Sequence, residues 1–172
     1  MQEMKVLALG MDPQAAQPVL LLQETAGRHR VLPVWVGASE ATAIELARQH
    51  VDAPRPQTHQ LIVQVVHSLG RRLEQVRITM LRDNVFHAEL VLDGETRVSA
   101  RVSDAVTMAL HVDVPIHAED AVLDEAALAE DQVIDKGADE GGDPAPEVDE
   151  AEEVEEFRRF LDSASPDDFG TG

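Results

Sequence analysis

The C-terminal part of the chain is strongly acidic, and this confines the folded core to the residues before it. Residues 119–172 contain 20 Asp and Glu but only 3 Lys and Arg, whereas residues 1–118 contain 13 and 11, so the net charges are −17 and −2. Residues 130–146 are rich in Asp, Glu, Gly and Pro and have few large apolar side chains, which is typical of disordered segments.

We therefore divide the chain into four parts. Residues 1–128 are predicted to form one domain, followed by an acidic disordered linker at 129–148. Residues 149–163 have the pattern of an amphipathic helix, with Pro166 behind it, and 164–172 form a flexible tail. A helix this short is not stable alone, so we expect it to dock on this domain, on a second copy or on another protein.

Within the first 128 residues, strand-like and helix-like patterns follow each other twice. Branched apolar residues between turn-like flanks predict the strands, and Pro33 places the third strand near a sheet edge. Each set of strands is followed by a helix that has Ser and an acid at its start, Ser39-Glu40 and Ser103-Asp104, which are 64 residues apart. The predicted strands are 4–9, 18–23, 30–36, 71–81 and 85–92 joined by a hairpin-type turn at 82–84, a strand ending near 100, and a short one that starts at 115–116; the predicted helices are 39–50, 58–69, 103–112 and a short one at 120–129.

This order predicts an α+β fold of two layers, in which helices cover one face of a largely antiparallel sheet. The similarity of the two helix starts suggests an internal duplication of a strand-strand-helix unit. Ser39, Thr58 and Ser103 are suitable N-caps for their helices, and Gly70 a suitable C-terminal stop. Leu61, Ile62, Val65, Val66 and Leu69 form an apolar stripe on the second helix.

Composition excludes several kinds of chemistry. The chain has no cysteine, so it has neither disulfides nor thiolate nucleophiles or metal ligands. No apolar run is long enough to span a membrane, and the N-terminus lacks the pattern of a signal peptide, so we expect a cytoplasmic protein without a membrane partner.

Four segments together resemble a known family. They read LPVWVGASEATAIELA (32–47), RPQTHQLI (55–62), FHAELVL (86–92) and ARVSDAVTMALHVDVPI (100–116). In order and spacing they resemble the bifunctional nuclease domain family, and EEFRRFLDSASPDDF near the C-terminus is similar to the tail of actinobacterial members. The resemblance implies an α+β domain, a homo-oligomer of two or more subunits, and nuclease activity on DNA and RNA.

The sequence departs from the family pattern at two positions. Gln60 stands where the family usually has an aspartate after the histidine, which removes one candidate metal ligand or His-orienting group. Val102 stands where the family usually has a proline, and this change affects loop stiffness.

Residues at the helix starts are the candidates for chemistry. Helix N-termini and arginines bind phosphate, and carboxylates hold divalent cations. If the helix starts converge, His59 would act as base or ligand, Asp104 and Glu40 would serve in catalysis and hold Mg²⁺ or Mn²⁺, and Arg55 and Arg101 would contact the phosphate. Thr58 and Ser103 complete the substrate-binding set.

The presence of these residues can also be explained by structural roles that involve no ligand. Asp104 is stabilised by the helix dipole alone, and Arg55 and Arg101 could form salt bridges to Glu40 and Asp104. The sequence has no His-x-x-x-His pair and no aromatic platform for bases. Three hypotheses therefore stay open: a metal-assisted nuclease; a non-catalytic module that binds nucleic acid or protein and whose acidic tail modulates binding; and a small-molecule sensor with an apolar pocket.

Overall fold

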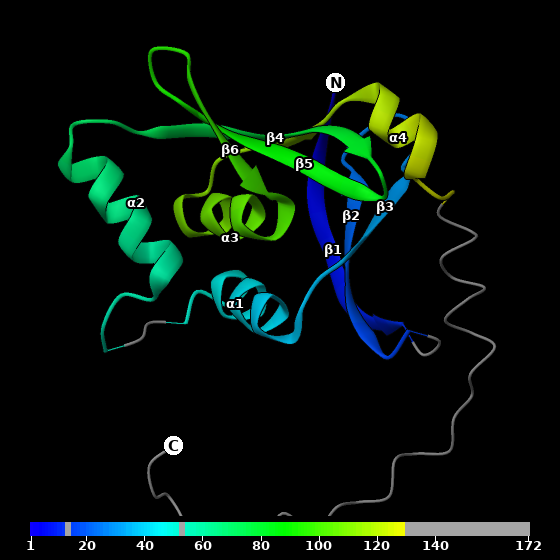
Figure 1. The fold of residues 1–172 in the computed structure, drawn as a ribbon, viewed down its shortest axis with the longest axis horizontal. Coiled ribbons are helices and arrows are strands. Elements are labelled where there is room, and N and C mark those ends of the chain that lie inside the picture. Colours follow the sequence, from blue (N-terminus) through cyan, green and yellow to red (C-terminus); the bar gives the residue numbers. More distant parts are fainter. Residues whose placement is uncertain (13–14, 52–53, 130–172) are drawn as a thin grey trace, which may run out of the picture. The chain divides into compact units, whose positions relative to one another are not determined.

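The fold is built around a seven-stranded β-sheet (Figure 1). The structure is a computed structural model that describes residues 1–12, 15–51 and 54–129. The elements in chain order are β1 (Gln2–Asp12), β2 (Gln17–Glu24), β3 (Val31–Trp35), α1 (Ala38–Arg48), α2 (Thr58–Ser68), β4 (Leu73–Arg82), β5 (Val85–Leu92), β6 (Thr96–Arg101), α3 (Val102–Val112), β7 (Ile116–Ala118) and α4 (Asp120–Ala126). The predicted linker, C-terminal helix and tail lie outside the described residues.

The sheet has the order β3-β2-β1-β7-β4-β5-β6. Every neighbouring pair is antiparallel except β4 and β7, which are parallel. Each half consists of three strands that pair in succession and then a helix, β1-β2-β3-α1 and β4-β5-β6-α3, and the short β7 joins the halves. The α+β class and the mostly antiparallel sheet are confirmed.

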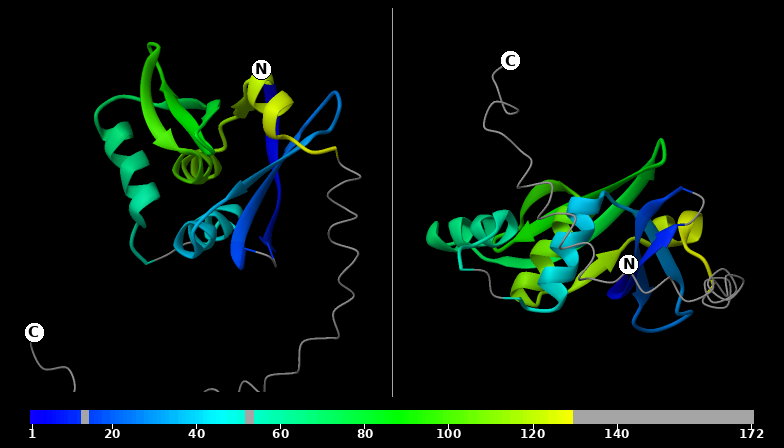
Figure 2. Two further views of the ribbon diagram at one scale, coloured as in Figure 1. Left: turned by 45° about the vertical axis from the view of Figure 1, so that its right-hand side comes forward. Right: turned by 90° about the horizontal axis from the view of Figure 1, so that it is seen from below.

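The sheet is strongly bent, and α1 and α3 lie inside the bend (Figures 1 and 2). The core between them is aliphatic. Alternate residues of the strands, such as Leu20, Leu22, Val76 and Ile78, are almost fully buried against α1 and α3. Burying this apolar surface is the main force that holds the two halves together.

Local sequence signals placed several turns and edges correctly. Pro33 lies in β3, which is an edge strand, so its missing N–H costs no ladder hydrogen bond. Asp83 and Asn84 both have positive φ in the β4–β5 hairpin, as a two-residue turn of the primed type requires. Gly70 ends α2 with a φ of 74°.

Helix α2 differs from the prediction. It lies at one end of the fold, beside α3, and none of its residues is buried (Figure 2). Val63 and Val66 contact the core, whereas four members of the predicted stripe are exposed: Leu61, Ile62, Val65 and Leu69. The stripe is apolar, but only its Val66 edge finds a partner within the described chain.

The three predicted N-caps were wrong. The N-cap residues are Gly37, Gln57 and Arg101, each with extended backbone, so the helices begin one or two residues earlier than the Ser and Thr positions indicated. At α2 a reciprocal pair of bonds between Gln57 and Gln60 forms a capping box, which satisfies the free N–H groups that Thr58 was expected to satisfy.

Candidate functional site

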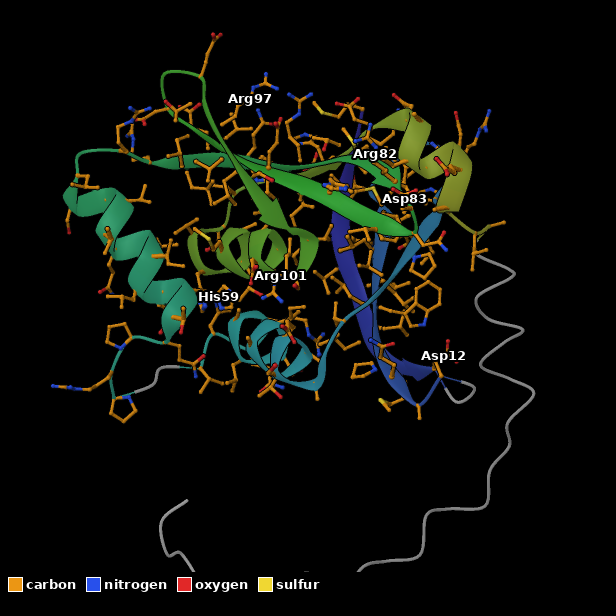
Figure 3. All side chains as sticks on the ribbon, in the orientation of Figure 1. Asp12, His59, Arg82, Asp83, Arg97 and Arg101 are labelled. Atoms are coloured by element: carbon orange, nitrogen blue, oxygen red, sulfur yellow. The ribbon has the colours of Figure 1, made fainter. Side chains whose placement is uncertain are left out.

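The starts of α1, α2 and α3 meet, and four polar side chains join them. His59 Nε2 on α2 lies 3.1 Å from Asp104 Oδ1 on α3. Arg101, just before α3, donates to both carboxylate oxygens of Asp104, at 2.7 and 3.0 Å, and its third bond of 2.8 Å reaches Glu40 on α1. Figure 3 shows His59 and Arg101 at this junction. Convergence was predicted for these four residues and Arg55; the structure brings the four together, without Arg55, and we call them the helix-start cluster.

The cluster is partly shielded from solvent. The side chains of His59, Glu40 and Asp104 are 16%, 21% and 29% exposed, whereas that of Arg101 is 65% exposed. Arg101 has five N–H donors, and three of them donate to the carboxylates among the described residues. Two N–H groups of this exposed guanidinium therefore remain for a ligand.

Electrostatics keep both carboxylates ionised. Hydrogen bonds from Arg101, and then from His59, hold the pKa of Asp104 below its usual range, although partial burial opposes them. The pKa of Glu40 is lowered first by its own backbone N–H, then by the Ser39 hydroxyl and by Arg101. The same two carboxylates, Asp104 before Glu40, raise the pKa of Arg101 further.

Glu40 is held in place by its local backbone. Ser39 donates to Glu40 Oε2 at 3.0 Å, and the carboxylate folds back over Gly37, where any Cβ would overlap it. The carboxylate therefore does locally what a capping side chain would do, while its other oxygen accepts from Arg101.

The other predicted site residues lie outside this cluster. Thr58 is exposed at the first turn of α2, and Ser103 is only 7% exposed in the first turn of α3. The Ser103 carbonyl accepts a 2.7 Å bond from the Thr107 hydroxyl. Arg55 is exposed on the loop before α2, where it lines a cavity with Gln60 and His111.

The donor set does not fit a divalent cation in this arrangement. Among the described residues, no three His, Asp or Glu side chains are grouped so that they could hold a metal. Asp104 and Glu40 both bond to Arg101, which balances their charge. They would have to release Arg101 before they could hold Mg²⁺ or Mn²⁺.

Three of the strand arginines are engaged in ion pairs within the domain. Arg30 pairs with Glu24 and Asp124, Arg71 with Asp93, and Arg77 with Glu89 and Glu119. Arg55 and Arg101 are exposed and lie at the helix starts, so they are candidates for contact with a polyanion there.

Three residues that contribute to this region could not be identified as such from the sequence alone. Gln60 has a capping role that its motif position did not suggest, although a Gln three residues after the cap is a known signal. Because Gly37 has no Cβ, the Glu40 carboxylate can fold back over it, and no local sequence pattern indicates this role. His111 lies two helical turns after Asp104, a spacing that could have placed it on the same side of α3.

Comparisons with known proteins agree with the motifs. The family model described as Bifunctional nuclease domain matches residues 20–131. Uncharacterized proteins Rv1829 and MT1877, from two strains of Mycobacterium tuberculosis, are each 47% identical over 169 residues, covering 98% of both chains. Bifunctional nuclease 1 of Arabidopsis thaliana is 26% identical over 108 residues, which is 59% of this chain and 33% of the plant protein.

No helix in the described part of the chain is long and apolar enough to cross a membrane. On the extent of the family match and of the mycobacterial similarity, this chain belongs to the bifunctional nuclease domain family.

Proposed function

We propose that the domain hydrolyses phosphodiester bonds of DNA and RNA and that His59 and Asp104 are its catalytic dyad. The observation that supports this most directly is the 3.1 Å approach of His59 Nε2 to Asp104 Oδ1 beside an exposed guanidinium. A carboxylate that orients a histidine, next to a phosphate-binding group, is a recurrent arrangement for activating a nucleophile.

In the proposed reaction each nitrogen of His59 has its own role. When Nε2–H donates to Asp104, the imidazole is fixed in the tautomer whose Nδ1 is unprotonated. Nδ1 then takes a proton from water, the water oxygen bonds to phosphorus, and the bond from phosphorus to the leaving oxygen breaks. The leaving oxygen takes up the proton of the imidazolium, or it takes one from solvent while the imidazolium releases its proton to solvent, so the dyad returns to its starting state.

Arg101 would bind the substrate through its two remaining N–H groups. A guanidinium presents planar paired donors that match phosphate oxygens, and it would stabilise the negative charge that builds up as water attacks. Glu40 then acts as a positioning residue, because it holds Arg101 from the α1 side. Thr58, at the open end of α2, is a further candidate contact to the phosphate.

The experiment is cleavage of labelled single- and double-stranded DNA and RNA by extensively purified protein. His59→Ala and Asp104→Asn should each lower the rate at least about a hundredfold, as loss of a general base does. His67→Ala, on the exposed side of the same helix, is the matched control and should cut at the wild-type rate. Equal cutting by wild type and both dyad variants would show that the activity comes from another site or from a contaminant.

Parallel reactions with Mg²⁺, with Mn²⁺ and with a chelator test the role expected for Asp104 and Glu40 as metal ligands. Activity that survives the chelator supports a reaction carried by the side chains alone. Activity that requires the cation means that Arg101 leaves the carboxylates in the working enzyme.

A second candidate is a binding module without catalysis. It is supported by the pairing of both carboxylates with Arg101, which makes the cluster a clamp between α1, α2 and α3 even with no ligand present. Residues 130–172 carry 16 of the 33 acidic residues, so they would repel nucleic acid or attract a basic partner. In this case deletion of 130–172 should raise affinity for nucleic acid sharply, while His59→Ala changes little.

We also propose that the protein is a homo-oligomer that associates through α2. Leu61, Ile62, Val65 and Leu69 are 41–75% exposed on one helix. A contiguous apolar surface of this kind is common at subunit interfaces and costly in water.

A further inference from the structure

A polar cavity of about 320 Å³ lies beside the helix-start cluster. It is bounded by the loop before α2, by the first half of α2 and by the end of α3. Its polar wall consists of Arg55, Gln60, Gln64 and His111, and its apolar surface comes from Pro54, Pro56 and Val63. This volume is at the lower end of the range for ligand pockets.

The cavity is placed to receive the part of a substrate next to the cleaved bond. Gln60 directly follows His59 on α2. His111 follows Asp104 by seven residues on α3, so the two side chains lie about 10 Å apart along the helix axis. The cavity wall therefore belongs to the two helices that carry His59 and Asp104, and a strand with its phosphate at Arg101 would place a neighbouring base toward it.

The wall offers uncharged hydrogen-bonding groups. Gln60 uses its Oε1 to accept from the Gln57 N–H at 3.0 Å, which leaves its amide N–H groups free. The Gln64 amide makes no hydrogen bond to other described residues, so both its donors and its acceptor are available. A Gln side chain pairs with the donor and acceptor groups on the edge of a nucleobase.

His111 adds a flat, neutral ring. Burial, and then the neighbouring His59 and His50, lower the pKa of His111, so the imidazole is uncharged at neutral pH. A neutral imidazole carries one donor and one acceptor and can stack on a base, and the rings of Pro54 and Pro56 add apolar surface to the lining.

Arg55 gives the cavity its positive charge. It is exposed and makes no hydrogen bond or ion pair with the rest of the described chain, and no carboxylate is among the residues that line the cavity. A ligand with an uncharged polar ring and an anionic group fits this combination.

We propose that the cavity is a base-binding subsite, which takes one unpaired nucleobase of a single-stranded nucleic acid while Arg55 contacts the adjoining phosphate. The inference deepens the proposed function and rests on it. A base held in a duplex is not accessible to such a pocket, so the subsite predicts a preference for single strands.

The test is binding of the full-length protein to a labelled phosphorothioate single strand of eight nucleotides, measured by fluorescence anisotropy. Matched strands lack one base each, at successive positions. We expect one abasic position to lower affinity about tenfold, since stacking and edge contacts at one base are worth that much. Gln64→Leu, which keeps the side-chain size, should reduce this difference, and Gln75→Leu on the sheet should leave it unchanged.

Arg55→Ala should weaken binding to the intact and abasic strands alike and lower the slope of log affinity against log salt by about 1. Arg48→Ala, an exposed arginine paired with Glu45, is its control. Thermal unfolding of each variant shows whether the fold is retained. If Gln64→Leu does not fold, His111→Asn replaces it, because that change leaves the first turns of α2 intact.

The outcomes separate the two proposals. Equal affinity for intact and abasic strands, or no binding of the strand at all, overturns the subsite. If an ordinary strand is nevertheless cleaved, the nuclease proposal stands without it. If the abasic difference appears but no strand is cleaved, the subsite stands and the catalytic proposal fails.

Discussion

His59 and Asp104 are 45 residues apart in the chain, yet their side chains approach within 3.1 Å because α2 packs beside α3. Arg101 donates to both oxygens of the same carboxylate. The pair is therefore both a candidate dyad and a link between two helices, and the first two predictions separate these roles.

Asp104 should make stability depend on pH. Its pKa in the folded protein is below the usual value of 3.8, chiefly because of Arg101 and then His59. The unfolded chain therefore binds this proton at higher pH than the folded protein does, so the stabilisation is complete above pH 3.8 and is lost as the pH falls through the lower, folded-state pKa.

Asp104→Asn removes this contribution. We expect urea denaturation at pH 7 to show a lower free energy of unfolding for the variant than for wild type. The difference should shrink at pH 3 and below, where Asp104 is increasingly protonated in wild type too. A difference that stays constant between pH 7 and pH 3 would contradict an ionised, hydrogen-bonded Asp104.

Arg101→Lys keeps the charge but not the geometry. An ammonium cannot donate two parallel bonds to Asp104 and a third to Glu40, so the link between α1 and α3 is lost. We expect cleavage or strand binding to fall about tenfold or more, and the melting temperature to drop. Arg48→Lys, where the partner Glu45 lies in the same helix, is the control and should melt close to wild type. Equal behaviour of the two variants would mean that a single positive charge is all the site needs.

Gly37→Ala tests whether the Glu40 carboxylate needs the space that is free at Gly37. The φ of Gly37 is −73°, which any residue adopts, so backbone strain is not involved. An added Cβ would overlap Glu40 Oε2, the flexible end of a side chain, which can swing away. We expect a small change in melting temperature but a loss of function close to that of Glu40→Gln.

Gly10→Ala is the control for Gly37→Ala, since its Cβ would meet Val19 Cγ1 at an ordinary 3.6 Å. Melting curves and cleavage or strand-binding assays are compared for all three variants. Wild-type activity in Gly37→Ala would show that the position of the Glu40 carboxylate is unimportant.

The exposed face of α2 should drive self-association. We expect light scattering during size-exclusion chromatography to give a mass above the monomer's 18.8 kDa. The double variant Leu61→Glu, Val65→Glu should reduce this mass, because it places charge at the centre of the apolar face. Met11→Glu, at an exposed apolar position on β1, should leave it unchanged. A wild-type protein that runs as a monomer, or a double variant with an unchanged mass, would refute the role of α2.

The sequence by itself determined the elements and the order in which they follow each other. Strand patterns, the Asp83-Asn84 turn and the Gly70 stop are set by local backbone preferences, which act over a few residues and can be read from them. For the same reason the motif residues at the helix starts could be chosen as candidates, since charge near a helix end has a local physical meaning.

Tertiary structure decided how those elements are used. It brought His59, Asp104, Arg101 and Glu40 to one junction, because burying the core between the two halves of the sheet fixes where α1, α2 and α3 begin. It also left Leu61 and Leu69 exposed, although their spacing matches that of a buried stripe. Periodicity shows that a helix has an apolar face, but only the packing of distant segments decides whether that face is covered by the same chain.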